Sequence, residues 1–103
     1  MSTAGNLQAD TIIRRTVSVK AGLSADGGVL LDEATDVCYG VNASGIAMWQ
    51  FLIDPHPLHE VIAFLQSRYP ATESRIIDDD VRTFVIAMHR WNLLAMDHSH
   101  RQD

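Results

Sequence analysis

The stretch that sets the fold is GVLLDEATDVCYGVNASGIAMW, which spans residues 28–49. Its first part has apolar runs and period-two alternation, as strands do, and its last part repeats apolar residues such as Ile46 and Trp49 at helical spacing. Asn42 stands where the period changes, and its side-chain oxygen can accept hydrogen bonds from the free amides of a first helical turn. The stretch therefore predicts two strands, at residues 29–32 and 37–42, and then a helix.

The residues before this stretch predict one more strand. Residues 16–20 alternate small polar and β-branched side chains, which is the period of a half-buried strand. Gly27 and Gly28 then favour a turn, because glycine adopts positive φ without steric penalty. We expect a three-stranded antiparallel meander. Residues 1–11 and 97–103 have little apolar content, and we expect both ends to be flexible.

The residues after the stretch predict two more helices. Residues 58–69 carry apolar side chains at amphipathic spacing and end at a proline. The run Asp78-Asp79-Asp80 predicts the start of the third helix, since carboxylates stabilise a helix N-terminus. Asn92 is expected to close that helix in the left-handed conformation, after which Leu93-Leu94 would fold back over the core.

This order of elements predicts one α+β domain over residues 1–103, of the winged helix-turn-helix-like kind. A three-stranded antiparallel sheet is followed by three helices that cover one of its faces. A length of 103 residues with 47% hydrophobic content suits a single core. No secretory signal and no run of about 20 apolar residues is present, so we expect no membrane segment. The one cysteine, Cys38, fits a reducing compartment, and we expect a cytoplasmic protein.

The run from residue 28 to residue 94 resembles the PqqD-like family, also called the RiPP precursor peptide recognition elements. The resemblance lies in the order and spacing of several motifs, each of which mainly encodes core packing. They are Val29-Leu30-Leu31-Asp32, the turn at residues 33–36, Tyr39-Gly40-Val41-Asn42, the apolar ladder at residues 44–49, the helix at residues 58–69, Phe84-Val85 and Leu93-Leu94. Asn92 stands where the family often has glycine, and residues 54–57 form a proline-rich insert.

The resemblance implies that the chain is no enzyme and that it needs no cofactor, metal or catalytic residue. Such domains bind the leader segment of a ribosomally made precursor peptide as a strand added to the third strand, in the cleft beside the third helix. They deliver it to a separate modifying enzyme or leader peptidase. Free-standing members of about this length resemble those of pyrroloquinoline quinone and lasso-peptide pathways, and the resemblance favours the lasso type or a related pathway. A monomer and a homodimer both remain open.

The expected site combines the third strand with one flank of the third helix. Strand alternation turns Val37, Tyr39 and Val41 toward the helices and Cys38 and Gly40 outward. Gly40 marks either the close approach of another backbone or a bulge. On the third helix, Val81 and Val85 are expected at the seam with the sheet. Arg82, Ile86 and His89 are expected on a more exposed side wall. Core packing is the alternative for the apolar residues. The predicted peptide-binding residues are Val37, Cys38, Tyr39, Gly40, Val41, Val81, Arg82, Val85, Ile86 and His89.

Three other classes of function were weighed against peptide capture. The histidines, Cys38 and the acidic run do not form a spacing that suits catalysis or metal binding. A winged-helix DNA-binding module is disfavoured, because the net charge is -5, the eight basic residues are dispersed, and the third helix is expected to begin with aspartates. A homodimeric scaffold would use the same open edge of the third strand and stays possible.

Overall fold

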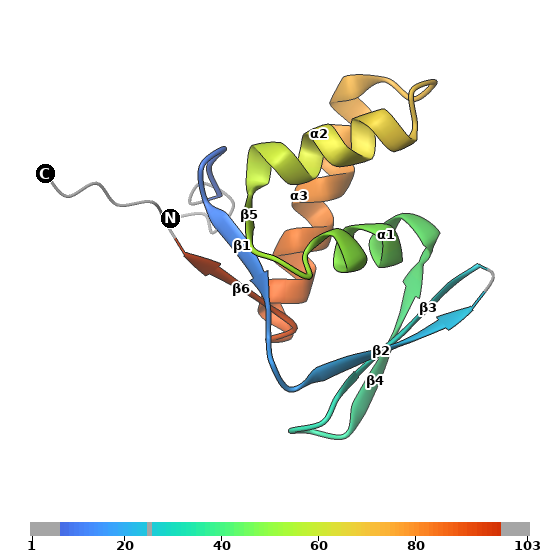
Figure 1. Ribbon diagram of the computed structural model, residues 1–103, viewed down its shortest axis with the longest axis vertical. Helices are drawn as coiled ribbons and strands as arrows, with labels where there is room; N and C mark the ends of the chain where they lie inside the picture. The colour runs from blue at the N-terminus through green and yellow to red at the C-terminus, as the bar shows by residue number, and fades with distance from the viewer. Residues whose placement is uncertain (1–6, 25, 98–103) are drawn as a thin grey trace, which may run out of the picture.

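The computed structural model describes residues 7–24 and 26–97. Its elements form two small antiparallel sheets, β5-β1-β6 and β2-β3-β4, packed around three helices (Figure 1). In chain order the elements are β1 (Ile12–Arg15), β2 (Val19–Ser24), β3 (Gly27–Asp32), β4 (Val37–Asn42), α1 (Ala43–Phe51), β5 (His56–Pro57), α2 (Leu58–Arg68), α3 (Ser74–Arg90) and β6 (Leu94–Asp97). None of the helices in this part of the chain is long and apolar enough to cross a membrane.

The predicted α+β meander is confirmed, with β2 shifted relative to the prediction. β3 pairs with β2 on one side and with β4 on the other, both antiparallel. Strand β2, the first strand of the meander, begins at Val19 and not at residue 16 as predicted. Thr16 instead takes part in a turn, in which its carbonyl accepts a hydrogen bond from Val19 N at 3.3 Å. Gly27 has a φ of 139°, as the turn before β3 requires.

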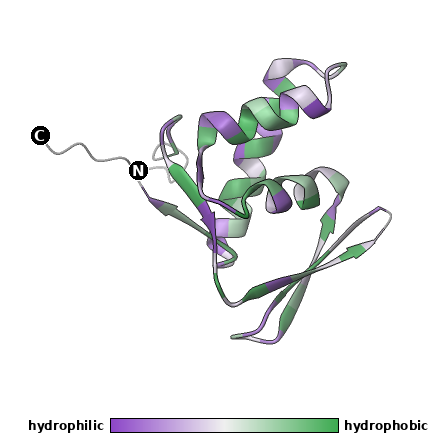
Figure 2. Ribbon diagram, viewed as in Figure 1, coloured by the Kyte–Doolittle hydropathy of each residue, from purple (hydrophilic) through white to green (hydrophobic). Residues whose placement is uncertain are grey.

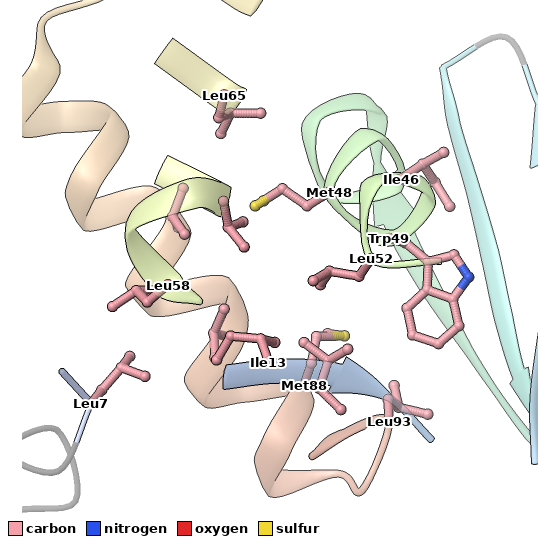
Figure 3. Packing of buried hydrophobic residues seen from close by; sticks show 14 of the residues in the cluster. Leu7, Ile13, Ile46, Met48, Trp49, Leu52, Leu58, Leu65, Met88 and Leu93 are labelled. Atoms are coloured by element: carbon pink, nitrogen blue, oxygen red, sulfur yellow. The ribbon is translucent and has the colours of Figure 1, made fainter. Parts of the chain in front are cut away.

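Helix α1 begins at the predicted cap. Asn42 Oδ1 accepts a hydrogen bond from Gly45 N at 2.9 Å, and the helix then crosses the sheet at β3. A Cβ atom on Gly28 would overlap the Gly22 carbonyl oxygen and lie 3.1 Å from Ile46 Cδ1. The missing side chain at Gly28 therefore lets α1 pack close to the middle strand. Trp49 fills the space between α1 and this sheet and is almost fully buried (Figure 3).

The core lies where the three helices meet β1. Figure 3 shows Ile13, Leu52 and Met88 gathered at its centre, from β1, the end of α1 and α3. Helix α2 adds Leu58, which is also buried, and Figure 2 shows hydrophobic and hydrophilic residues alternating along this helix, as an amphipathic helix requires.

The second sheet was missed by the sequence analysis. β1 pairs with β6 over four residues and with the two residues of β5. The Leu93-Leu94 pair folds back over the core as predicted, and both side chains are buried. Beyond it the chain continues as β6, which ends at Asp97. The strands of this sheet are too short to show a period, and β1 and β6 are far apart in the sequence.

The start of the chain is also better anchored than predicted. The expectation of a flexible end is wrong for residues 7–11, while residues 1–6 and 98–103 lie outside the described part of the chain. Leu7 is 5% exposed and packs into the core. Thr11 O accepts from Leu58 N at 2.8 Å, and Arg82 donates through Nη1 to the Leu7 carbonyl at 3.0 Å. Asp97, also predicted to be flexible, belongs to β6.

Helix α3 begins at Ser74, one turn before the predicted start at Asp78. The earlier start is stabilised by Ile77, which is 3% exposed and packs into the core. The run Asp78-Asp79-Asp80 therefore lies in the second turn, and Asp78 pairs with Arg82 at 2.6 Å. The prediction that aspartates stand at the very start of this helix, where they would repel DNA, is therefore wrong. Asn92 closes the helix with a φ of 62°, as predicted.

Gly28→Ala is expected to lower the free energy of unfolding by about 1–3 kcal/mol, because the new methyl group overlaps backbone and helix atoms. The matched control is Gly40→Ala, since a Cβ atom there meets nothing within 4 Å. It should leave stability within about 0.5 kcal/mol of the parent. Urea denaturation followed by circular dichroism measures both. Equal stability of the two variants would show that the close packing at Gly28 is unimportant.

Arg82→Ala is expected to loosen residues 7–11 without unfolding the domain. Loss of the charge-assisted bond to Leu7 should speed hydrogen exchange of the Gln8 and Thr11 amides about tenfold. Arg75→Ala is the control, because Arg75 makes only an exposed pair with Glu73. Unchanged exchange in the Arg82 variant would mean that this side chain does not hold the segment.

Candidate functional site

Strand β4 is an edge of its sheet. It pairs with β3 alone, and the register runs without interruption from Gly27↔Asn42 to Asp32↔Val37. In an antiparallel pair each strand uses only half of its N–H and C=O groups toward one neighbour. The remaining groups of β4 are therefore available to a further strand.

The two faces of β4 are arranged as predicted. Tyr39 and Val41 pack against the core from the face that also carries Val37, whose side chain is 42% exposed. Cys38 and Gly40 lie on the other face and are exposed. The continuous register excludes a bulge at Gly40, which was one of the two interpretations of this glycine. The other, the close approach of another backbone, stays a prediction.

Aromatic and apolar side chains of α3 form a wall beside β4. The ring of Trp91, at the end of α3, stacks on Tyr39 with centroids 4.8 Å apart and an interplanar angle of 26°. Trp91 is still 46% exposed, so it can contact a partner. Further up the helix, Phe84 lies close to Gly45 in the first turn of α1. These contacts place α3 next to the open edge of β4.

The side of α3 that faces β4 is not the side predicted. Val81 and Val85 are fully buried in the core, so their side chains cannot contact a ligand of the folded domain. Consecutive helical residues are turned by about 100°, which puts Arg82 and Phe84 on opposite flanks of this buried stripe. Arg82 accordingly turns away from β4 and binds Asp78 and the Leu7 carbonyl.

Ile86 and His89 share the flank of Arg82. Both are partly buried, and Ile86 packs against the core. The residues that the sequence analysis missed are on the β4 flank, at the spacing i, i+4, i+7 and i+11 that keeps side chains on one side of a helix. These are Asp80, Phe84, Ala87 and Trp91.

Two connected hollows continue the line of β4 past its last residue. The first is about 250 Å³ and is lined by Asn42, Ser44, Met48, Asp80, Thr83 and Phe84. The second is about 420 Å³, shares Asn42, Ser44 and Asp80 with the first, and continues over Leu65, Tyr69 and Ile77. Each is large enough for an apolar side chain. Asp26 and Asp80 are the only charged residues in the two linings.

No titratable cluster accompanies this groove. Among residues 7–24 and 26–97, no three His, Cys, Asp or Glu side chains come together in a way that could hold a metal ion. His56 is paired with Glu60 at 2.7 Å on another side of the domain, and its ring stacks on Phe51. The groove beside β4 thus has the character of a peptide-binding surface, with an open backbone edge, an aromatic wall and apolar hollows.

Comparison with known proteins agrees with this fold. Residues 27–94 match the family model described as coenzyme PQQ synthesis protein D (PqqD). A structure of TbiB1 in complex with the TbiA(beta) leader peptide is similar, with a TM-score of 0.69 and 21% identity over 86% of this chain and 99% of that chain. A lasso peptide synthetase B1 complexed with the leader peptide has a TM-score of 0.68 and 23% identity over 81% and 96%. No curated protein gives a significant match. Because the family model covers well over half of its residues, this chain belongs to the PqqD family.

Proposed function

We propose that this chain binds the leader segment of a ribosomally made precursor peptide as a strand added to β4, in the groove beside α3. The observation that carries the proposal is the position of the open β4 edge, with Trp91 stacked on Tyr39 beside it and two hollows at its end. Two proteins of similar fold have been solved with leader peptides, which supports the same kind of ligand here.

The added strand would gain most of its affinity from the backbone. About five new hydrogen bonds at roughly 1 kcal/mol each, with one or two apolar anchors at about 1.5–3 kcal/mol each, exceed the loss from ordering a flexible peptide. A dissociation constant near 1 μM, or about -8 kcal/mol, follows from these estimates.

Side chains on the groove would determine which leaders are bound. The stacked rings of Tyr39 and Trp91 offer an apolar platform to one side of the strand. Asp26 and Asp80 give the far end a negative potential, which favours a neutral or basic residue of the leader over an acidic one. The preferred leader would thus carry an apolar anchor for the platform. It would have no acidic residue where it lies beside Asp26 and Asp80.

Delivery to a separate enzyme completes the proposed role. In this proposal the domain contributes binding, and a modifying enzyme or leader peptidase acts on the captured peptide. A lasso-peptide pathway is the proposed context, in line with the lasso peptide synthetase B1 of similar fold. The domain would act there as an adaptor.

Gly40→Pro is expected to weaken leader binding at least tenfold, because it removes an amide N–H and stiffens the strand. The ligand is a fluorescently labelled leader peptide chosen from the short reading frames that neighbour this gene, and its binding is measured by anisotropy against a scrambled leader. Gly40→Ala keeps the N–H and should bind like the parent. A folded Gly40→Pro variant with parental affinity would rule out strand addition at this position.

Trp91→Ala and His89→Ala distinguish the two flanks of α3. Trp91 faces β4 and should contribute about 1–2 kcal/mol to binding, so its loss is expected to weaken the same leader about fivefold to thirtyfold. His89 lies on the other flank, and its variant should keep the parental affinity. The opposite pattern would support the flank first predicted from the sequence.

Cys38 offers a footprint on β4 that needs no mutation. It is exposed, and it is the only cysteine in the chain. A saturating leader should slow its alkylation by iodoacetamide about threefold or more, because the added strand restricts access to the thiol. A leader that binds without changing the alkylation rate would be bound elsewhere on the domain.

A further inference from the structure

The sheet has a second open edge, on the side away from β4. Helix α1 packs over the middle strand β3 and leaves β2, which pairs only with β3, uncovered along its outer side. Figure 1 shows the β2–β3 hairpin extending beyond the helices. Leu23, near the end of β2, is 61% exposed although it lies on the same face as the buried Leu30.

Three connected hollows run between β2 and the outer side of α1. One of about 410 Å³ contains Val17 and Ile53, and it shares Arg15 and Val19 with the next, of about 420 Å³. The second shares Leu23 and Gln50 with a third of about 200 Å³. Val17, Leu23 and Ile53 are the three most exposed large apolar side chains of the described residues. We name this surface the β2–α1 face, and it comprises Arg14–Val19, Lys20, Ala21, Leu23, Trp49, Gln50, Ile53 and Arg68.

The charges on this face are opposite to those beside β4. Arg14, Arg15, Lys20 and Arg68 line its hollows, and no acidic residue does. The chain has 13 acidic and 8 basic residues, so half of its basic residues lie on this one face. The groove beside β4 is lined by aspartates and by no basic residue. Arg14 pairs with Asp97 and Lys20 with Glu33, so the uncompensated positive charge of this face comes from Arg15 and Arg68. The hollows along the two open strand edges are thus lined by charges of opposite sign.

Arg15 is a fixed cation at the junction of two of these hollows. Its Nε and Nη2 donate to the Trp49 carbonyl at 2.9 and 2.7 Å, and its guanidinium lies 4.8 Å from the centroid of the Trp49 ring. Burial lowers the pKa of Arg15 from its usual value, but an arginine remains protonated at neutral pH. No carboxylate within residues 7–24 and 26–97 pairs with it, nor with Arg68.

We propose that the β2–α1 face binds an acidic strand of a second protein, which pairs with β2, places a carboxylate at Arg15 and covers Val17, Leu23 and Ile53. A strand fits because β2 offers unpaired backbone groups along a hollowed surface, which a flat membrane cannot pair with. A second copy of this chain fits poorly, because an isologous contact would bring identical cations together. The proposal goes beyond leader capture and does not depend on it.

The test uses a synthetic peptide, acetyl-Glu-Val-Glu-Leu-Glu-Val-amide, and its counterpart with lysine in place of glutamate. Each is titrated into the ¹⁵N-labelled protein while backbone amide shifts are followed. The acidic peptide should shift the amides of Lys20, Leu23 and Gln50, and it should bind at least tenfold more tightly than the basic one. Tenfold corresponds to about 1.4 kcal/mol.

Charge reversal at Lys20→Glu combined with Arg68→Glu should remove that preference, while the matched Arg75→Glu variant should retain it. Leader anisotropy measured on the same variants should equal that of the parent, so failure of this proposal is separate from failure of leader capture. The proposal is overturned by equal affinity for both peptides, by shifts confined to β4, or by no shift at millimolar peptide. Sedimentation equilibrium that shows dimerisation through β2 would also overturn the proposal. So would binding to phosphatidylglycerol vesicles without binding to the peptide.

Discussion

The close packing of α1 against the β2–β3–β4 sheet is the constraint on which the rest of the structure depends. It requires two positions without a side chain. At Gly28 a Cβ atom would overlap the Gly22 carbonyl, and at Gly45 it would overlap Val41 and lie 3.1 Å from Phe84. Gly45 is thus the point where β4, α1 and α3 come together. Because α1 can approach this closely, Trp49 is buried against the sheet and α3 comes to lie beside β4.

A helix placed over the middle strand of a three-stranded sheet leaves both outer strands uncovered by that helix. In this domain the surroundings of the two outer strands, β2 and β4, differ. On the β4 side α3 supplies an aromatic wall, and the hollows are lined by Asp26 and Asp80. On the β2 side α2 reaches the hollows with Arg68 at its end, and Arg15 is held in place by the carbonyl and ring of Trp49. Under the two proposals, one sheet would hold two extended segments of unlike charge, each recognised by the same backbone pairing.

Local signals in the sequence were sufficient for some of these features. The meander, the Asn42 cap and the left-handed Asn92 depend on neighbouring residues, and all three were predicted. The sheet of β1, β5 and β6 was not, since it pairs short segments far apart in the chain. The peptide-binding residues themselves stay a prediction, but the positions of their side chains can be compared with the structure. Strand alternation gave the faces of β4 correctly, but helical periodicity identifies only the buried stripe of α3. Periodicity does not say which flank of α3 faces β4. Arg82 was therefore predicted on that flank, where the structure has Phe84 and Trp91.

A domain that works by strand addition has to keep an edge available without pairing with its own copies. Both edge strands here are only six residues long, which limits the number of hydrogen bonds that a second copy could form. Lys20 adds a charge to β2, and a charged side chain is one of the ways in which natural edge strands resist pairing with their own copies. Short strands and a charged edge therefore limit self-association, while the backbone groups of the edge stay open to a ligand strand.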